Sequence, residues 1–294
     1  MARPAKAEIN LEALRNNYRV AQQAAPDSHT MAVVKANAYG HGVVAVAKAL
    51  EDDVPVFGVA CVEEAIELRE AGITKPILLM EGIFTVDEVA IAEAQNFWLA
   101  VGNQYQVDAV TQAALKKPLK IWLKVDTGMH RLGVQPEDAA EFYKQLAVSD
   151  NVANNIVVMS HLACGDQLER PETPKQLQRF NQAIGDIKAI AHSLAQYIET
   201  SIANFPATMA WGYCYRNWNC SGYMFYWGNL FGYSQEFADQ LKLVIHLTTD
   251  VSASRYSTLG VSVGYGAHCF ATLVAIFSTM SHVYVRVYQR LIHQ

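Results

Sequence analysis

The decisive stretch of this sequence is Val33-Val34-Lys35-Ala36-Asn37-Ala38-Tyr39-Gly40-His41-Gly42, which carries a lysine at the end of an apolar segment. Gly40 and Gly42 permit backbone angles that other residues resist, so the chain is able to approach a ligand closely. Burial of an unpaired ammonium is costly. We therefore expect Lys35 either to form an ion pair or to use its amine covalently, as a Schiff base.

Residues 34–42 resemble the pyridoxal-phosphate attachment motif of the alanine racemase family at every position. The resemblance implies that Lys35 forms an imine with pyridoxal 5′-phosphate and that Tyr39 reaches the phosphate of this cofactor. A match over nine consecutive residues is far more specific than an isolated glycine pattern.

Strand-like and helix-like segments alternate from residue 30 to about residue 230, and helical periodicity is longest over Glu172–His192. Eight such strands predict a (β/α)8 TIM barrel, with a doubly wound open sheet as the alternative. The predicted strands are Thr30–Lys35, Val56–Ala60, Pro76–Met80, Phe97–Val101, Leu119–Val125, Asn155–His161, Tyr197–Asn204 and Tyr223–Tyr226.

A short strand (Ala7–Asn10) and a helix (Leu11–Tyr18) are expected before the barrel, and strands alone after residue 236. We predict a barrel domain over residues 1–235, leader strand included, and a partial β-rich domain over residues 236–294. In the family that the motif resembles, the leading strand joins a β domain at the other end of the chain. The resemblance implies that this second domain is incomplete here.

Composition excludes several classes of protein. A net charge of −5 gives no reason to expect nucleic acid, and five cysteines without paired spacing predict neither a metal site nor a disulfide framework. The segment 201–294 holds only eight charged residues but 18 aromatic ones, and polar residues interrupt its apolar run, which favours buried β structure over a membrane span. Because the N-terminus lacks the apolar core of a signal peptide, a cytoplasmic protein is expected.

The fifth predicted strand leads into Lys124-Val125-Asp126-Thr127-Gly128-Met129-His130-Arg131-Leu132-Gly133. Lys124 and Arg131 would repel each other unless an anion separates them; a solvated loop with Asp126 as partner is the alternative. The stretch resembles a second alanine racemase motif. That resemblance implies that Arg131 donates to the phenolic oxygen of the cofactor, and that Lys124 occupies a position that carries a carbamate in many members.

Two further strand ends carry candidate residues. A histidine after an apolar run, such as His161, is usually a satisfied core group, but here it resembles the family histidine that contacts the cofactor region and tunes the catalytic base. Ser201-Ile202-Ala203-Asn204-Phe205-Pro206-Ala207 resembles the family stretch that binds cofactor through Asn204. Phe205 stands where that stretch has a serine.

Trp218-Asn219-Cys220-Ser221-Gly222-Tyr223-Met224 resembles the family segment whose backbone amides cradle phosphate, here those of Gly222 and Tyr223. Cys220 replaces an arginine that faces the pyridine nitrogen in the family, and Arg216 is the nearby candidate for a substitute. Near the C-terminus, the spacing from Val263-Gly264-Tyr265-Gly266 assigns the catalytic tyrosine of the family to Tyr284, although a strand tyrosine often serves only in packing.

The resemblance implies a racemase that interconverts L- and D-alanine, with Lys35 and Tyr284 as the two bases. Tyr284 would come from a partner subunit, so a homodimer is expected if the C-terminal domain folds. No metal, nucleic acid or membrane partner is expected. The alternatives are a single-barrel protein that binds pyridoxal phosphate without racemising, and an inactive derivative.

Overall fold

The computed structural model describes residues 5–229, 231–263, 265–267, 269–270, 272 and 275–280. The chain divides into two compact units. One unit is Leu11–Val244, and the other combines the residues before Leu11 with those after Val244. Each unit is described by itself below.

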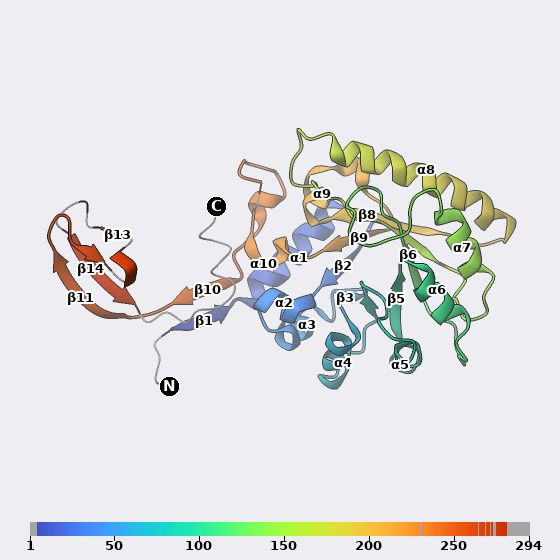
Figure 1. The fold of residues 1–294 in the computed structure, drawn as a ribbon, viewed down its shortest axis with the longest axis horizontal. Helices are drawn as coiled ribbons and strands as arrows, with labels where there is room; N and C mark the ends of the chain where they lie inside the picture. Colours follow the sequence, from blue (N-terminus) through green and yellow to red (C-terminus); the bar gives the residue numbers. More distant parts are fainter. Residues whose placement is uncertain are drawn as a thin grey trace. The chain divides into compact units, whose positions relative to one another are not determined.

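The larger unit is built on a closed barrel of eight parallel strands (Figure 1), as the alternation of segments predicts. Strand β2 pairs with β3 on one side and with β9 on the other, where Met31 lies opposite Cys220, so the sheet has no free edge and is not an open doubly wound sheet. The strands are β2 (His29–Val33), β3 (Phe57–Val59), β4 (Ile77–Leu79), β5 (Phe97–Val101), β6 (Ile121–Lys124), β7 (Val157–Met159), β8 (Glu199–Asn204) and β9 (Trp218–Ser221).

Helices follow the barrel strands and cover the outside of the barrel (Figure 1). The amphipathic segments predicted from the sequence form helices at the expected places, with ends that shift by a few residues. The α-helices are α1 (Leu11–Ala24), α2 (Lys35–Gly40), α3 (Val43–Leu50), α4 (Val62–Glu70), α5 (Glu88–Gln95), α6 (Gln104–Thr111), α7 (Ala139–Ala147), α8 (Glu172–Ser193), α9 (Phe205–Ala210) and α10 (Met224–Trp227), and the short 3-10 turns are Gly212–Cys214, Ala238–Gln240 and Tyr265–Ala267.

Three indole rings occupy the interior of the barrel. Trp98, Trp122 and Trp218 pack against one another with ring centroids 5.4–6.4 Å apart, and Met31 and Met159 belong to the same buried cluster. The inside of the barrel is therefore a packed core rather than a channel. Ligand chemistry must take place at the carboxyl ends of the strands, where the loops begin.

The eighth barrel strand was predicted at the wrong place. Tyr223–Tyr226 is not a strand, because residues 224–227 form the short helix α10, and the strand that closes the barrel is β9. Its buried polar side chains conceal the strand pattern: Asn219 donates to Thr30 Oγ1 at 3.1 Å, and Ser221 donates to Asn219 Oδ1 at 3.1 Å. Trp218 and Cys220 point into the barrel, so these polar side chains face outward, where buried polar groups are stable when they pair with each other in this way.

The second unit consists of antiparallel strand pairs. Strand β1 (Lys6–Ile9), the predicted leader strand, pairs with β10 (Ile245–Thr248). The other pairs are β11 (Val251–Ser257) with β14 (Ala275–Met280), and β12 (Ser262–Val263) with β13 (Cys269–Phe270). Among the described residues, no helix combines the length and apolar character that crossing a bilayer demands.

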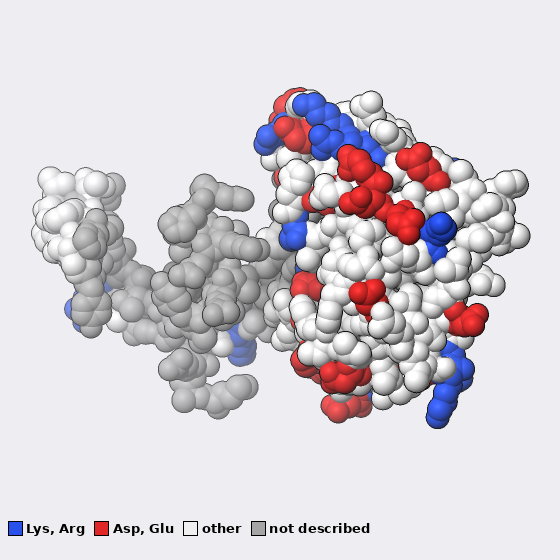
Figure 2. All heavy atoms as spheres, turned by 45° about the vertical axis from the view of Figure 1, so that its right-hand side comes forward, with Lys and Arg blue, Asp and Glu red and all other residues white. Residues whose placement is uncertain are grey.

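Charged side chains on the face of the barrel unit drawn in Figure 2 lie in small groups of both signs, separated by uncharged surface. Acidic groups are prominent across the middle of this face. A face of mixed charge favours contact with water over the binding of a polyanion such as a nucleic acid.

Candidate active site

Lys35 is separated from the end of β2 by a single residue and begins α2 at the carboxyl end of the barrel. The next four residues, Ala36 to Tyr39, have φ of 53–54°, so this turn is left-handed although none of them is glycine. Each L-residue in that conformation costs about 1–2 kcal/mol. The surrounding structure must therefore hold the turn in place.

Two side chains supply that support. The Glu64 carboxylate at the start of α4 accepts hydrogen bonds from the Ala36 amide at 2.7 Å and the Ala60 amide at 2.8 Å. Asn37 accepts from the Val43 amide at 2.7 Å through Oδ1. Glu64 therefore links the backbone beside Lys35 to the loop after the neighbouring strand β3.

Lys124 is the last residue of β6 and is buried, while Arg131 lies in the loop that follows. The two side chains line one small pocket together with His161. Burial, followed by the charges of Arg131 and Lys35, lowers the pKa of Lys124 to about 8. The repulsion expected from the sequence is thus present, and Lys124 and Arg131 do not sit in separate, fully solvated positions.

His161 follows β7 at the same end of the barrel. Burial, together with the charges of Arg131, Lys124 and Lys35, lowers the pKa of the His161 imidazole to about 3. A histidine in this environment stays neutral at physiological pH. Four basic side chains therefore converge at the carboxyl end of the barrel, an arrangement that favours an anionic ligand.

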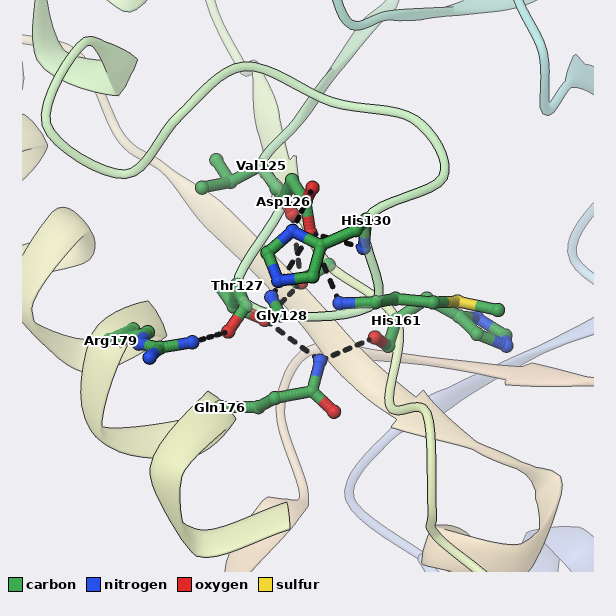
Figure 3. A network of polar contacts seen from close by, with 10 residues as sticks. Val125, Asp126, Thr127, Gly128, His130, His161, Gln176 and Arg179 are labelled. Carbon is green, nitrogen blue, oxygen red and sulfur yellow. Dashed lines mark hydrogen bonds and ion pairs between the residues drawn. The ribbon is translucent and has the colours of Figure 1, made fainter. Parts of the chain in front are cut away.

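The loop after β6 is organised around the Asp126 carboxylate (Figure 3). Asp126 Oδ1 accepts from the amides of Gly128, Met129 and His130 at 2.9–3.1 Å, and Oδ2 contacts His130 Nδ1 at 3.2 Å. Burial opposes ionisation of this carboxyl group, but the amide donors outweigh it and lower the pKa. Asp126 therefore shapes the loop and does not pair with Lys124. The alternative interpretation, a solvated loop with Asp126 as the partner of the basic residues, is not what the structure has.

Tyr39 and Gly222 meet at the junction of β2 and β9. A Cβ added to Gly222 would lie 2.8 Å from Tyr39 Oη, so only glycine leaves room for the hydroxyl there. Burial raises the pKa of Tyr39 to about 12, which keeps the hydroxyl protonated as a donor. The ring of Tyr223 meets the ring of Tyr39 edge to face, with centroids 5.9 Å apart.

Asn204 ends β8 and caps α9. Its Oδ1 accepts from the Ala207 amide at 3.3 Å, and its Nδ2 donates to Leu162 O at 3.0 Å. Phe205 is buried with its ring 4.9 Å from that of Phe225, so this position supplies apolar packing in place of a hydroxyl.

Cys220 is buried on β9, where its sulfur lies 3.5 Å from Ser201 Oγ. Burial raises the pKa of the Cys220 thiol, which keeps it uncharged. Arg216 precedes β9 at the amino end of the barrel, and its guanidinium donates to Tyr215 O and to Asn181 Oδ1. The interpretation of Arg216 as a substitute for the missing arginine is therefore wrong. Arg216 lies at the amino end of β9, whereas the candidate site lies at the carboxyl end.

The structure thus gathers Lys35, Tyr39, Lys124, Arg131 and His161 at the carboxyl end of the barrel, with Gly222 beside Tyr39. Tyr284 lies outside the described residues. Sequence reasoning missed Glu64 and also Gln176, whose amide joins two loops of the site (Figure 3). Both belong to amphipathic helices, where Glu and Gln are ordinary residues and give no local signal.

Comparison with known sequences finds relatives along most of the chain. A sequence model of the alanine racemase N-terminal domain matches residues 9–229. The catabolic alanine racemase of Pseudomonas aeruginosa is 42% identical over 265 residues, which span 90% of this chain and 71% of that protein. An alanine racemase of Chromohalobacter salexigens is 40% identical over 268 residues, with the same shares of the two chains.

Comparison with solved structures agrees. The biosynthetic alanine racemase of Pseudomonas aeruginosa superposes with a TM-score of 0.86 at 36% identity, covering 95% of this chain and 75% of that one. The alanine racemase of Bartonella henselae, solved with covalently bound pyridoxal phosphate, superposes with a TM-score of 0.80 at 25% identity, over 94% and 75% of the two chains.

Proposed function

The chain belongs to the alanine racemase family of pyridoxal-phosphate-dependent isomerases, and from that premise we propose that it interconverts L- and D-alanine with the cofactor attached to Lys35. The observation that carries this proposal is the convergence of Lys35, Lys124, Arg131 and His161 at one end of a closed barrel.

The donor set fits pyridoxal phosphate. The cofactor brings a phosphate and a phenolic oxygen, and these negative groups offset the repulsion among the basic side chains. We assign Arg131 to the phenolic oxygen, and the Tyr39 hydroxyl with the Gly222 and Tyr223 amides to the phosphate. Asn204 completes the set, with its side chain fixed at the end of β8. The phosphate end lacks a hydroxyl at Phe205, which predicts weaker binding there.

When bound, the cofactor supplies the conjugated system that spreads the negative charge left when the amino acid loses its Cα proton. The chain supplies the two bases that racemisation requires, one on each face of Cα, because a single base tends to return the proton to the side it left. Lys35 holds and releases the proton on one face. Tyr284, from a partner subunit of a homodimer, serves the other face.

His161 contributes as a neutral group. A histidine with a pKa of about 3 neither adds a fourth charge to the cluster nor competes for the transferred proton near neutral pH. It remains available to donate or accept one hydrogen bond beside the cofactor. This is consistent with a role in orienting the catalytic base.

Lys124 is suited to carry a carbamate. Carbon dioxide reacts only with a neutral amine, and a pKa of about 8 leaves a substantial neutral fraction near neutral pH. The reaction forms an N–C bond, releases a proton, and replaces a positive group by a negative one that Arg131 pairs with. A carbamate resonance on 13C-bicarbonate addition to the wild-type chain, absent in Lys124→Met, tests this assignment.

The test of the main proposal begins with a spectrum. Purified chain with added pyridoxal phosphate should develop absorbance near about 420 nm, and borohydride should fix the cofactor on Lys35. The protein should then racemise L-alanine, and Tyr284→Phe should abolish that activity while leaving the absorbance intact. A chain that takes up the cofactor and never interconverts alanine would refute the racemase assignment.

A second candidate function has its own support. Cys220 places a neutral, buried thiol where the family pattern has an arginine facing the pyridine nitrogen. A chain with weaker control of the reaction would bind the cofactor as a single-barrel carrier without racemising. The same spectrum and racemisation assay separate the two candidates.

A further inference from the structure

The amide of Gln176 joins two loops of the site to helix α8 (Figure 3). Gln176 is 2% exposed, and its Nε2 donates to Thr127 Oγ1 at 3.2 Å and to the His161 carbonyl at 2.9 Å. Its Oε1 accepts from the Ala163 amide at 2.8 Å. One side chain thus contacts the loop after β6 and, twice, the loop after β7.

The hydrogen bonds beyond Gln176 run in one direction. The Ser160 hydroxyl donates its only proton to the Val125 carbonyl at 2.8 Å. The Thr127 hydroxyl, 2.7 Å from Ser160 Oγ, must therefore be the donor to it, and Thr127 Oγ1 then accepts from Gln176. The relay extends from α8 through Thr127 and Ser160 to the end of β6, and each buried hydroxyl in it has both a donor and an acceptor.

The loop after β6 carries a cation, Arg131, that the neighbouring Lys124 repels. Arg131 belongs to the loop after β6 and His161 to the loop after β7, and both lie close to Lys124. Like charges in a poorly solvated pocket tend to separate. Arg179, one turn further along α8, also connects this helix to the loop after β6, because it donates a hydrogen bond to the Thr127 carbonyl at 3.0 Å.

We propose that Gln176 is a positioning residue, whose amide holds the Arg131 and His161 loops at the spacing that the anionic cofactor requires. This inference rests on the proposed function, since the cofactor is the ligand that the loops are positioned for. Gln176 acts through Thr127 and the His161 backbone and does not itself reach the reacting atoms.

Three variants and one control test the relay. Gln176→Met keeps the volume and removes both donors, and Thr127→Val removes the hydroxyl in the middle. Each should raise the dissociation constant for pyridoxal phosphate, read from absorbance near 420 nm, by about tenfold or more. Thr127→Ser restores the hydroxyl and should bring the constant back to within about threefold of wild type. Gln178→Glu, on an exposed position of the same helix, should leave it unchanged.

Amide hydrogen exchange in the cofactor-free chain separates positioning from general stability. Gln176→Met should speed exchange at residues 127–131 and 161–163 while the barrel strands keep wild-type protection. Wild-type cofactor affinity in Gln176→Met, or equal loss of protection throughout the barrel, would overturn the inference. If the wild-type chain takes up no cofactor at all, the proposed function fails, and the exchange data still decide whether Gln176 holds the loops.

Discussion

Replacement of Lys124 by methionine should stabilise the cofactor-free chain at pH 7. Lys124 is 7% exposed, and its pKa falls from 10.5 to about 8 because of burial and the charges of Arg131 and Lys35. A depression of that size means that holding the proton in the folded chain costs about 3 kcal/mol relative to the unfolded chain. Lys124→Met removes this cost and keeps a long, flexible side chain in the cavity.

The sign of the effect follows from proton linkage. Because the folded-state pKa lies below the unfolded one, the penalty is fully present below pH 8 and disappears as pH rises through 10.5. A gain of about 3 kcal/mol corresponds to a rise in melting temperature of about 6–12 °C for a unit of this size. The gain should shrink steadily between pH 8 and pH 10.5.

The assay is urea or thermal unfolding of the wild type and of Lys124→Met, in phosphate-free buffer at pH 7 and pH 10.5. Lys117→Met, at an exposed lysine, is the matched control and should change stability by no more than about 0.5 kcal/mol. Inorganic phosphate should stabilise the wild type more than Lys124→Met. A variant less stable than wild type at pH 7, or a gain of equal size at both pH values, would contradict the reasoning.

Three shorter predictions concern the rest of the site. Lys35→Ala should abolish borohydride trapping of pyridoxal phosphate, and yellow protein after reduction and dialysis would place the attachment elsewhere. Cys220→Arg should raise racemase activity per cofactor bound, and unchanged activity would mean that residue 220 does not face the cofactor. Because residue 220 is only 5% exposed, the larger arginine side chain should also lower the stability of the cofactor-free chain by about 1–3 kcal/mol. Glu64→Ala should destabilise the left-handed turn by about 2 kcal/mol and slow cofactor attachment, whereas Glu63→Ala, at an exposed neighbour, should leave the attachment rate unchanged.

Periodicity was sufficient to predict the barrel, because most of its strands are short β-branched or apolar runs flanked by amphipathic helices. It failed at β9, where Asn219 and Ser221 form buried hydrogen bonds and break the apolar pattern. The aromatic run after Gly222 resembled a strand, but its rings pack on Tyr39 and the run forms the short helix α10.

The site was predictable where its residues end strands, since Lys35, Lys124 and His161 all occupy that position. The handedness of the turn after Lys35 was not predictable, because alanine and tyrosine do not favour positive φ and the turn is supported by hydrogen bonds to Glu64 and Asn37. The role of Gln176 was not predictable for a similar reason, because its hydrogen-bond partners lie 13 to 49 positions away along the chain. Spatial partners at such separations leave no mark in local spacing.

The pairing of β2 with β9 bears on the order in which this protein acquires its chemistry. Met31 and Cys220 are opposite each other in the finished barrel, yet nearly the whole of the larger unit separates them along the polypeptide. During synthesis from the N-terminus, Lys35 emerges early, while Gly222, which leaves space for the Tyr39 hydroxyl, emerges only after nearly all of the barrel. A nascent chain therefore has no finished pocket for an aldehyde until β9 has left the ribosome and paired with β2.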